Sequence, residues 1–189
     1  MIDPTRITNF DRTESELEEF LLFCIMVAGK QSRVEAKKLD ALLSEDTDKL
    51  GPFLFLGWED FGGTLEETLR RHRIAPYASR LKSFGEAWRI KCSLKQVHFL
   101  SLIEVYGISH KTANFFLTHS RRGHDYPVLD THILSYLRDK GFPAPKHSPQ
   151  NAVAYAKWAK VFSDVAADQG LSVADLDLRI WTERSTKNS

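Results

Sequence analysis

The chain has 189 residues and a mass of 21.6 kDa, with 42% hydrophobic and 27% charged residues. These proportions are those of an ordinary soluble globular protein, so they argue against a disordered chain. The longest apolar run, residues 20–28, is well short of the roughly 20 residues that a membrane-spanning helix needs. The two cysteines, Cys24 and Cys92, cannot form a disulfide framework or supply the four ligands of an iron–sulfur cluster or a structural zinc site.

The formal net charge of +1 hides an uneven distribution along the chain. Residues 1–69 carry 7 Lys or Arg against 15 Asp or Glu, a net of −8, whereas residues 70–122 carry 11 against 2, a net of +9. A basic middle segment that follows an acidic one can direct a polyanion to one face of a protein. On charge alone, a solvated helix surface is the simpler interpretation.

The order of the residues predicts an all-α protein. Thr13-x-x-Glu16 resembles a capping box and precedes an apolar helix over 17–28, while Gly51-Pro52 opens an irregular apolar stretch that ends at Gly62-Gly63. No segment alternates with the period of a strand between hairpin turns. Further helices are expected over residues 32–44, 64–71, 76–88, 94–105, 111–118, 131–140, 149–167 and 172–183.

The most informative part of the chain is a pair of helices joined by a tight turn. Tyr106-Gly107-Ile108-Ser109-His110 stops the first helix, and the second begins at Lys111. The successive backbone N–H groups of such a turn, beside a new helix N-terminus, can hold a phosphate oxygen. Taken alone, the pattern fits an ordinary helix connection better.

The segment after the second helix adds a carboxylate at a fixed spacing. Asp130 follows the extended residues 127–129 and stands 19 positions after Lys111. Together these segments resemble the helix-hairpin-helix DNA glycosylase superfamily. Its hairpin has the form Leu-x-Gly-x-Gly-x-Lys-x-Ala, and a Pro-Val-Asp-x-His segment carries its catalytic aspartate. Here the hairpin spans Val105–Ala113, with Ser109 in place of the second glycine, where the family often needs a positive φ, and Pro127–His132 is the second segment.

The C-terminal segment resembles one group of enzymes within this superfamily. Ala174–Trp181 is similar to the last helix of the small 8-oxoguanine DNA glycosylase/lyases, of the second bacterial–archaeal type and the archaeal type. In the archaeal type, residues spaced like Asp177 and Trp181 help to enclose the extruded base. Gln31 and Trp58 are further candidates for that pocket. Phosphate contacts are expected from the hairpin and from the basic pair after its second helix: Gly107, Ser109, His110, Arg121 and Arg122.

The resemblance also implies an architecture. Residues 1–189 are expected to form a single glycosylase domain shaped as a two-lobed helical bundle, with the active cleft between the lobes. The N- and C-terminal helices would form one lobe, and residues 70–140, roughly, would form the lobe that carries the hairpin.

The chemistry that it implies is base excision. Lys111 would attack the sugar C1′, displace the base and leave a Schiff base that permits β-elimination, while Asp130 stabilises the positive charge that develops on the sugar. A lysine is almost entirely protonated at neutral pH, so it needs desolvation or nearby cations to act as a nucleophile. The predicted activity is therefore that of a bifunctional 8-oxoguanine DNA glycosylase/lyase.

This interpretation requires no cofactor, and the scattered histidines show no metal-ligand spacing, so we expect no metal. The partner is double-stranded DNA with an oxidised purine, not a membrane, and the enzyme is expected to act as a monomer. The acidic N-terminus lacks a signal-peptide pattern, which predicts a cytoplasmic protein, associated with the nucleoid in a prokaryote.

Three alternatives remain open at this point. A monofunctional glycosylase for another damaged base would release the base without a covalent intermediate. A non-catalytic helix-hairpin-helix module would use the turn only to bind DNA, and a helical scaffold would not bind DNA at all. Each candidate residue also has an ordinary role, because Asp130 can cap a helix and Lys111 can be an exposed first-turn lysine.

Overall fold

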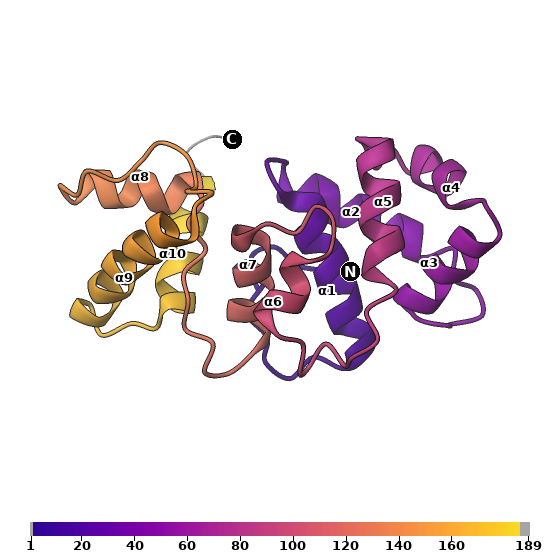
Figure 1. The fold of residues 1–189 in the computed structure, drawn as a ribbon, viewed down its shortest axis with the longest axis horizontal. Coiled ribbons are helices and arrows are strands. Elements are labelled where there is room, and N and C mark those ends of the chain that lie inside the picture. Colours follow the sequence, from indigo (N-terminus) through magenta and orange to yellow (C-terminus); the bar gives the residue numbers. More distant parts are fainter. Residues whose placement is uncertain (1, 186–189) are drawn as a thin grey trace. The chain divides into compact units, whose positions relative to one another are not determined.

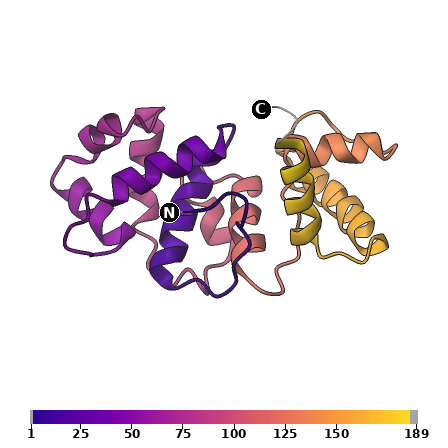
Figure 2. The ribbon, with the colours of Figure 1, turned by 180° about the vertical axis from the view of Figure 1, so that it is seen from behind.

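The computed structural model describes residues 2–185 and confirms the all-α class: no strand occurs in this part of the chain (Figures 1 and 2). Ten helices follow one another within it. Their bounds are α1 Glu14–Val27, α2 Ser32–Leu43, α3 Pro52–Phe61, α4 Leu65–Arg71, α5 Tyr77–Ala87, α6 Phe99–Ile103, α7 His110–Ser120, α8 Thr131–Asp139, α9 Ala152–Asp168 and α10 Val173–Ser185.

The contacts between helices divide the chain into two compact units. The N-terminal unit comprises Asp11–Ser109 and the residues before Ile7, and the C-terminal unit comprises Ile7–Phe10 and the chain from His110 onward. In the first, α1 packs against α2, α3 and α5; in the second, α10 packs against α7, α8 and α9. This division differs from the predicted one, which grouped the N- and C-terminal helices in one lobe. The boundary falls within the predicted hairpin, between Ser109 and His110.

The N-terminal unit is built around α1. The predicted capping box is confirmed, because the Thr13 side chain accepts a hydrogen bond from the Glu16 backbone while the Glu16 carboxylate accepts one from the Thr13 backbone. Every residue from Phe20 to Met26 is buried, as expected for a helix that is apolar on all sides. The Arg80 guanidinium closes the other end of α1 by donating to the carbonyl oxygens of Ile25, at 2.6 Å, and Met26, at 3.1 Å.

The expectation of an irregular stretch over residues 51–63 was wrong. Pro52 occupies the first turn of α3, where its fixed φ and missing N–H are tolerated. Gly57 lies inside this helix, where a Cβ would stand 3.0 Å from the Trp88 ring. The glycine therefore marks a close approach between side chain and backbone and does not mark a turn.

The predicted helix over residues 94–105 was only partly correct, because α6 begins at Phe99. The Glu14 carboxylate, from the start of α1, accepts hydrogen bonds from the Leu94 N–H and, at 2.8 Å, from the Ser93 hydroxyl. These long-range bonds hold residues 93–97 in a turn. Burial of Leu94 and Val97 explains the apolar pattern that suggested a helix.

Three predicted helix starts had different outcomes. Ser172 caps α10 as expected, since its hydroxyl accepts from the Asp175 N–H at 3.1 Å. Pro149 was expected in the first turn of the long helix, but α9 begins later, after Asn151, whose side chain accepts from the Val153 and Ala154 N–H groups. Thr64 stands at the start of α4 without capping it.

The core of the C-terminal unit lies between α8, α9 and α10. All three helices contribute fully buried side chains to it, such as Leu134 on α8, Phe162 on α9 and Leu176 on α10. Residues 7–10 join this unit through a hydrogen bond from the Asn9 N–H to the His119 carbonyl oxygen, at 3.0 Å. Within this unit, one side of α7 packs against α10.

Candidate active site

The turn before α7 has the backbone geometry that the hairpin motif requires. Gly107 takes φ +84°, and a Cβ there would stand 3.3 Å from the Ser83 Cβ, so both conformation and space favour glycine. Ser109 does not need a positive φ: outside glycine, only Lys49 and Arg73 have one among the described residues. The strain suggested by a serine at the second glycine position is therefore absent.

Lys111 lies in the first turn of α7 and is half-buried. Its ammonium group makes no ion pair within 4.0 Å in the part of the chain that the structure describes. The side chain belongs to the N-terminal, electropositive end of an 11-residue helix.

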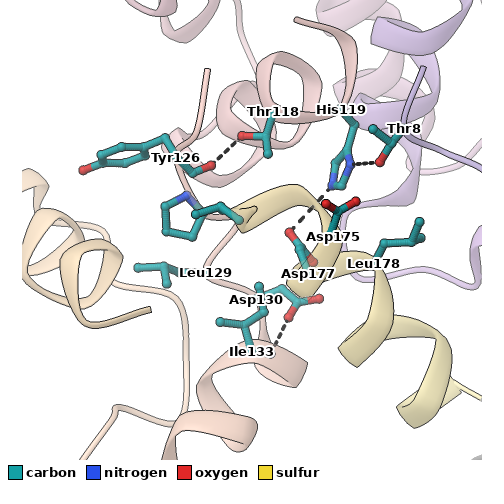
Figure 3. A network of polar contacts seen from close by, with 12 residues as sticks. Thr8, Thr118, His119, Tyr126, Leu129, Asp130, Ile133, Asp175, Asp177 and Leu178 are labelled. Carbon is teal, nitrogen blue, oxygen red and sulfur yellow. Dashed lines mark hydrogen bonds and ion pairs between the residues drawn. The ribbon is translucent and has the colours of Figure 1, made fainter. Parts of the chain in front are cut away.

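Asp130 caps α8. Its Oδ1 atom accepts a hydrogen bond from the Ile133 N–H at 2.9 Å, and the residue is half-buried (Figure 3). The ordinary role foreseen for this residue is therefore real. The hydrogen bond from the Ile133 N–H also fixes the direction of the Asp130 carboxylate.

Asp177 is the second acidic residue of the candidate site and is buried on α10. Its Oδ2 atom lies 3.7 Å from His119 Nε2, an ion-pair separation that is too long for a hydrogen bond. The other ring nitrogen, Nδ1, lies 2.8 Å from the hydroxyl of Thr8 (Figure 3). Thr8, His119 and Asp177 thus form a chain of polar contacts that runs from residues 7–10 through α7 to α10.

The charge of Asp177 is opposed by its surroundings. Burial raises the pKa of the Asp177 carboxyl, His119 lowers it, the negative charge of Asp130 raises it and the positive charge of Lys111 lowers it. The net direction is upward. These couplings place Lys111 and Asp130 within electrostatic range of Asp177, although Lys111 is 66 positions away from it in the sequence. Opposed charges of this kind gather at functional sites.

The remaining base-pocket candidates lie in both units. Trp181 is half-buried on α10, four residues after Asp177 and hence on the same face of the helix. Gln31 precedes α2 and is exposed, and Trp58 on α3 is 73% exposed; both belong to the N-terminal unit. Trp181 therefore shares a helix face with Asp177, and the base-pocket roles of Gln31, Trp58 and Trp181 remain predictions.

The basic pair after α7 makes contacts of its own. The Arg122 guanidinium lies over the Phe10 ring, 5.2 Å from its centroid. Burial lowers the pKa of Arg121. Both side chains belong to the C-terminal unit, and their role in binding phosphate remains a prediction.

Sequence reasoning missed His119, Asn114 and Tyr155, which surround the predicted residues. Asn114 and His119 are buried on α7, and the Asn114 Oδ1 atom lies 3.3 Å from His124 Nε2. A signal for Asn114 was present, because polar side chains at 111, 114 and 118 recur with helical spacing, but His119 lies outside this pattern. Tyr155 had no such signal, since its role depends on a loop from another part of the chain.

The described residues were compared with the requirements of a metal site and of a membrane-spanning helix. Residues 2–185 contain no group of three or more His, Cys, Asp or Glu side chains placed to hold a metal ion. Within the same range, no helix is both long enough and apolar enough to cross a membrane.

No family model matches the chain. Among solved structures, the chain is similar to the 8-oxoguanine DNA glycosylase of Methanocaldococcus jannaschii, with a TM-score of 0.72 and 23% identity over 96% of this chain and 84% of that one. It shares its fold with that enzyme. A second structure, of the M. jannaschii 8-oxoguanine glycosylase/lyase with a 15mer DNA containing 8-oxoguanine, matches with a TM-score of 0.69 and 23% identity, over 96% and 88% of the two chains. The fold implied by the hairpin and the Pro-Val-Leu-Asp segment is thereby confirmed.

Proposed function

We propose that this protein is a bifunctional DNA glycosylase/lyase that removes 8-oxoguanine during base-excision repair. The observation that carries the proposal is that the charges of Lys111, on α7, and of Asp130 both act on the buried carboxyl group of Asp177. The chain that carries these three residues shares its fold with the M. jannaschii 8-oxoguanine glycosylase/lyase. The fold supports the reaction class, and the three side chains supply the groups that the reaction needs.

The proposed reaction begins with the extrusion of the damaged base from the duplex, at a cost of a few kcal/mol. The Lys111 amine attacks C1′, the bond from C1′ to the base breaks, and the base leaves with a proton. Asp130 stabilises the positive charge that develops on the sugar. The lone pair of the nitrogen then expels O4′, which takes up a proton from water as the C1′–O4′ bond breaks, and the resulting protonated Schiff base acidifies the C2′ proton. Removal of that proton breaks the bond to the 3′ phosphate.

The substrate contacts follow the same reasoning. Asp177 is the candidate acceptor for the N7–H of 8-oxoguanine, a hydrogen that guanine lacks, and Trp181 or Trp58 would stack on the base. Gln31 would use its donor and acceptor on the Watson–Crick edge. Phosphates would be held by Gly107, Ser109, His110, Arg121 and Arg122. The proposal uses no cofactor and places a monomer on duplex DNA in the cytoplasm, at the nucleoid in a prokaryote.

The deciding experiment is borohydride trapping on a duplex with a single 8-oxoguanine. We expect a covalent protein–DNA adduct and a cleaved strand, and neither with undamaged duplex or with Lys111→Gln. Base release without an adduct would indicate a monofunctional glycosylase. Salt-sensitive binding with neither base release nor cleavage would indicate a binding module only.

A second experiment tests the lesion. Excision of 8-oxoguanine is compared with excision of uracil and of alkylated purines for the wild type, Asp177→Ala and Trp181→Ala. We expect the wild type to prefer 8-oxoguanine and both variants to lose that preference. Preference of the wild type for another base would reject 8-oxoguanine as the substrate while leaving the lyase chemistry in place.

A further inference from the structure

Tyr155, on α9, holds the loop that leads to Asp130. The side chain is 2% exposed, and its hydroxyl donates to the Pro127 carbonyl oxygen at 2.9 Å while accepting from the Leu129 N–H at 3.1 Å. One oxygen atom therefore binds the backbone on both sides of Val128. The second of these bonds reaches the residue immediately before Asp130.

The same side chain faces the helix that carries Lys111. The Asn114 side chain, one turn after Lys111, interacts with the Tyr155 hydroxyl. The Asn114 Nδ2 atom is buried and makes no hydrogen bond of good geometry among the described residues, so this contact is mainly electrostatic. The edge of the His110 ring approaches the Tyr155 ring, with centroids 6.0 Å apart and planes at 80°.

The Tyr155 hydroxyl can hold the loop over residues 127–129 at any physiological pH. Burial raises the pKa of Tyr155 to about 12, against smaller opposing contributions from the Leu129 N–H and Asn114. The group therefore keeps its proton and its donor role throughout the physiological range. The Tyr126 ring stacks on the Tyr155 ring, with centroids 6.1 Å apart and planes at 9°, which limits rotation of the side chain.

We infer that Tyr155 is a positioning residue that sets the Asp130 carboxylate relative to the Lys111 amine. The inference rests on the proposed function, because it gives Tyr155 no chemical step of its own. Asp130 is the N-cap of α8, so its position depends on where that helix begins. The Tyr155 hydroxyl anchors the loop that leads into the helix and therefore determines where the helix begins. Displacing a catalytic group by about 1 Å costs on the order of 100-fold in rate.

The test is Tyr155→Phe, which removes the hydroxyl and keeps the ring. Under single-turnover conditions with 8-oxoguanine duplex, the rate of base excision is expected to fall about 10- to 100-fold. Affinity for the same duplex should stay within about two-fold, because no DNA contact is removed. Tyr136→Phe is the matched control, since it removes an exposed tyrosine hydroxyl of the same unit that accepts from Gln169 Nε2 at 2.9 Å. We expect it to react at the wild-type rate.

A double-mutant cycle separates positioning from general support of the fold. If Tyr155 acts through Asp130, adding Tyr155→Phe to Asp130→Asn should cost much less than it costs in the wild type. Equal costs in the two backgrounds would overturn the inference, as would a Tyr155→Phe variant that excises at the wild-type rate.

Two further outcomes are distinguishable. Should Tyr155→Phe fail to fold, Asn114→Ala removes the α7 side of the link, with His124→Ala as its control because Asn114 also contacts His124; a lower excision rate at unchanged affinity in Asn114→Ala alone would support the inference, and an unchanged rate would reject it. A wild-type protein that neither excises 8-oxoguanine nor forms an adduct would reject the proposed function instead.

Discussion

The two units treat buried polar side chains differently. In the N-terminal unit these residues are spread over the segment before α1 and over α2, α4 and α5: Arg12, Glu35, Thr68, Arg80 and Ser83. In the C-terminal unit four of the five belong to the single helix that carries Lys111: Thr112, Asn114, Thr118 and His119, with Asp177 as the fifth. The first unit disperses its buried polar groups, and the second concentrates them beside one helix.

The charges around these groups also differ. Arg80 donates to two carbonyl oxygens at the end of α1, and the buried carboxylate near it, Glu35, has the opposite charge. Asp177 has the carboxylate of Asp130 nearby as well as His119 and Lys111. Opposite charges beside backbone groups stabilise a fold, whereas like charges brought together cost stability and shift pKa values. The polar groups of the first unit therefore stabilise its fold, whereas those beside α7 have the charge environment that the proposed chemistry requires.

The largest expected effect is that of Lys111→Gln. Removing the only amine of the cluster should abolish both the borohydride adduct and strand cleavage, because no Schiff base can form without a nucleophilic amine. Lesion binding, measured by titration of labelled duplex, should persist. Lys82→Gln in the N-terminal unit is the control and should trap normally. Trapping by Lys111→Gln at the wild-type rate would place the nucleophile elsewhere.

Asp130→Asn should have the next largest effect. Asparagine retains an oxygen that can accept from the Ile133 N–H, so the cap on α8 survives while the negative charge is lost. We expect base excision to slow by about 100-fold or more. Asp164→Asn, at an exposed ion pair with Lys160, should excise normally. If Asp130→Asn turns over at the wild-type rate, the residue is a helix cap and nothing more.

A smaller effect is expected from Arg121→Gln with Arg122→Gln. If both side chains neutralise phosphates, the slope of log K against log salt should become less steep by up to about two, without a change in lesion preference. Lys157→Gln with Lys160→Gln, on α9, removes the same charge outside the basic segment and should leave the slope unchanged. An unaltered slope in the arginine variant would place the DNA footprint on other residues.

The smallest effect concerns the stability of Asp177→Asn. The folded-state pKa of Asp177 is raised, so wild type loses stability as pH rises through the unfolded-state value, near 3.8, and then through the higher folded-state value. The variant carries no charge and lacks this loss. Its free energy of unfolding relative to wild type should therefore increase from acid to neutral pH. Urea unfolding at several pH values measures this, with Asp164→Asn as the exposed control.

Local interactions explain what the sequence alone determined. The capping box of Thr13 and Glu16 and the Ser172 cap join residues three apart, and both were read correctly from spacing. The helix starts at Lys111 and Asp130 were predicted from local signals as well, because the turn and the extended Pro-Val-Leu segment define where helices begin, whereas the catalytic roles of the two residues were implied by the family resemblance. The class of fold followed from these helix boundaries and from the absence of strand periodicity.

Interactions between distant residues decided the rest. The Glu14 carboxylate converts residues 93–97 from a predicted helix into a turn, and the Trp88 ring explains a glycine inside α3. Asp177 meets His119 from 58 positions away, and Tyr155 reaches Pro127 across 28. Spacing along a chain constrains only neighbours on one element, because contacts between elements depend on how their faces pack. The charge environment of Asp177 and the anchoring of the Asp130 loop therefore emerged only from the tertiary structure.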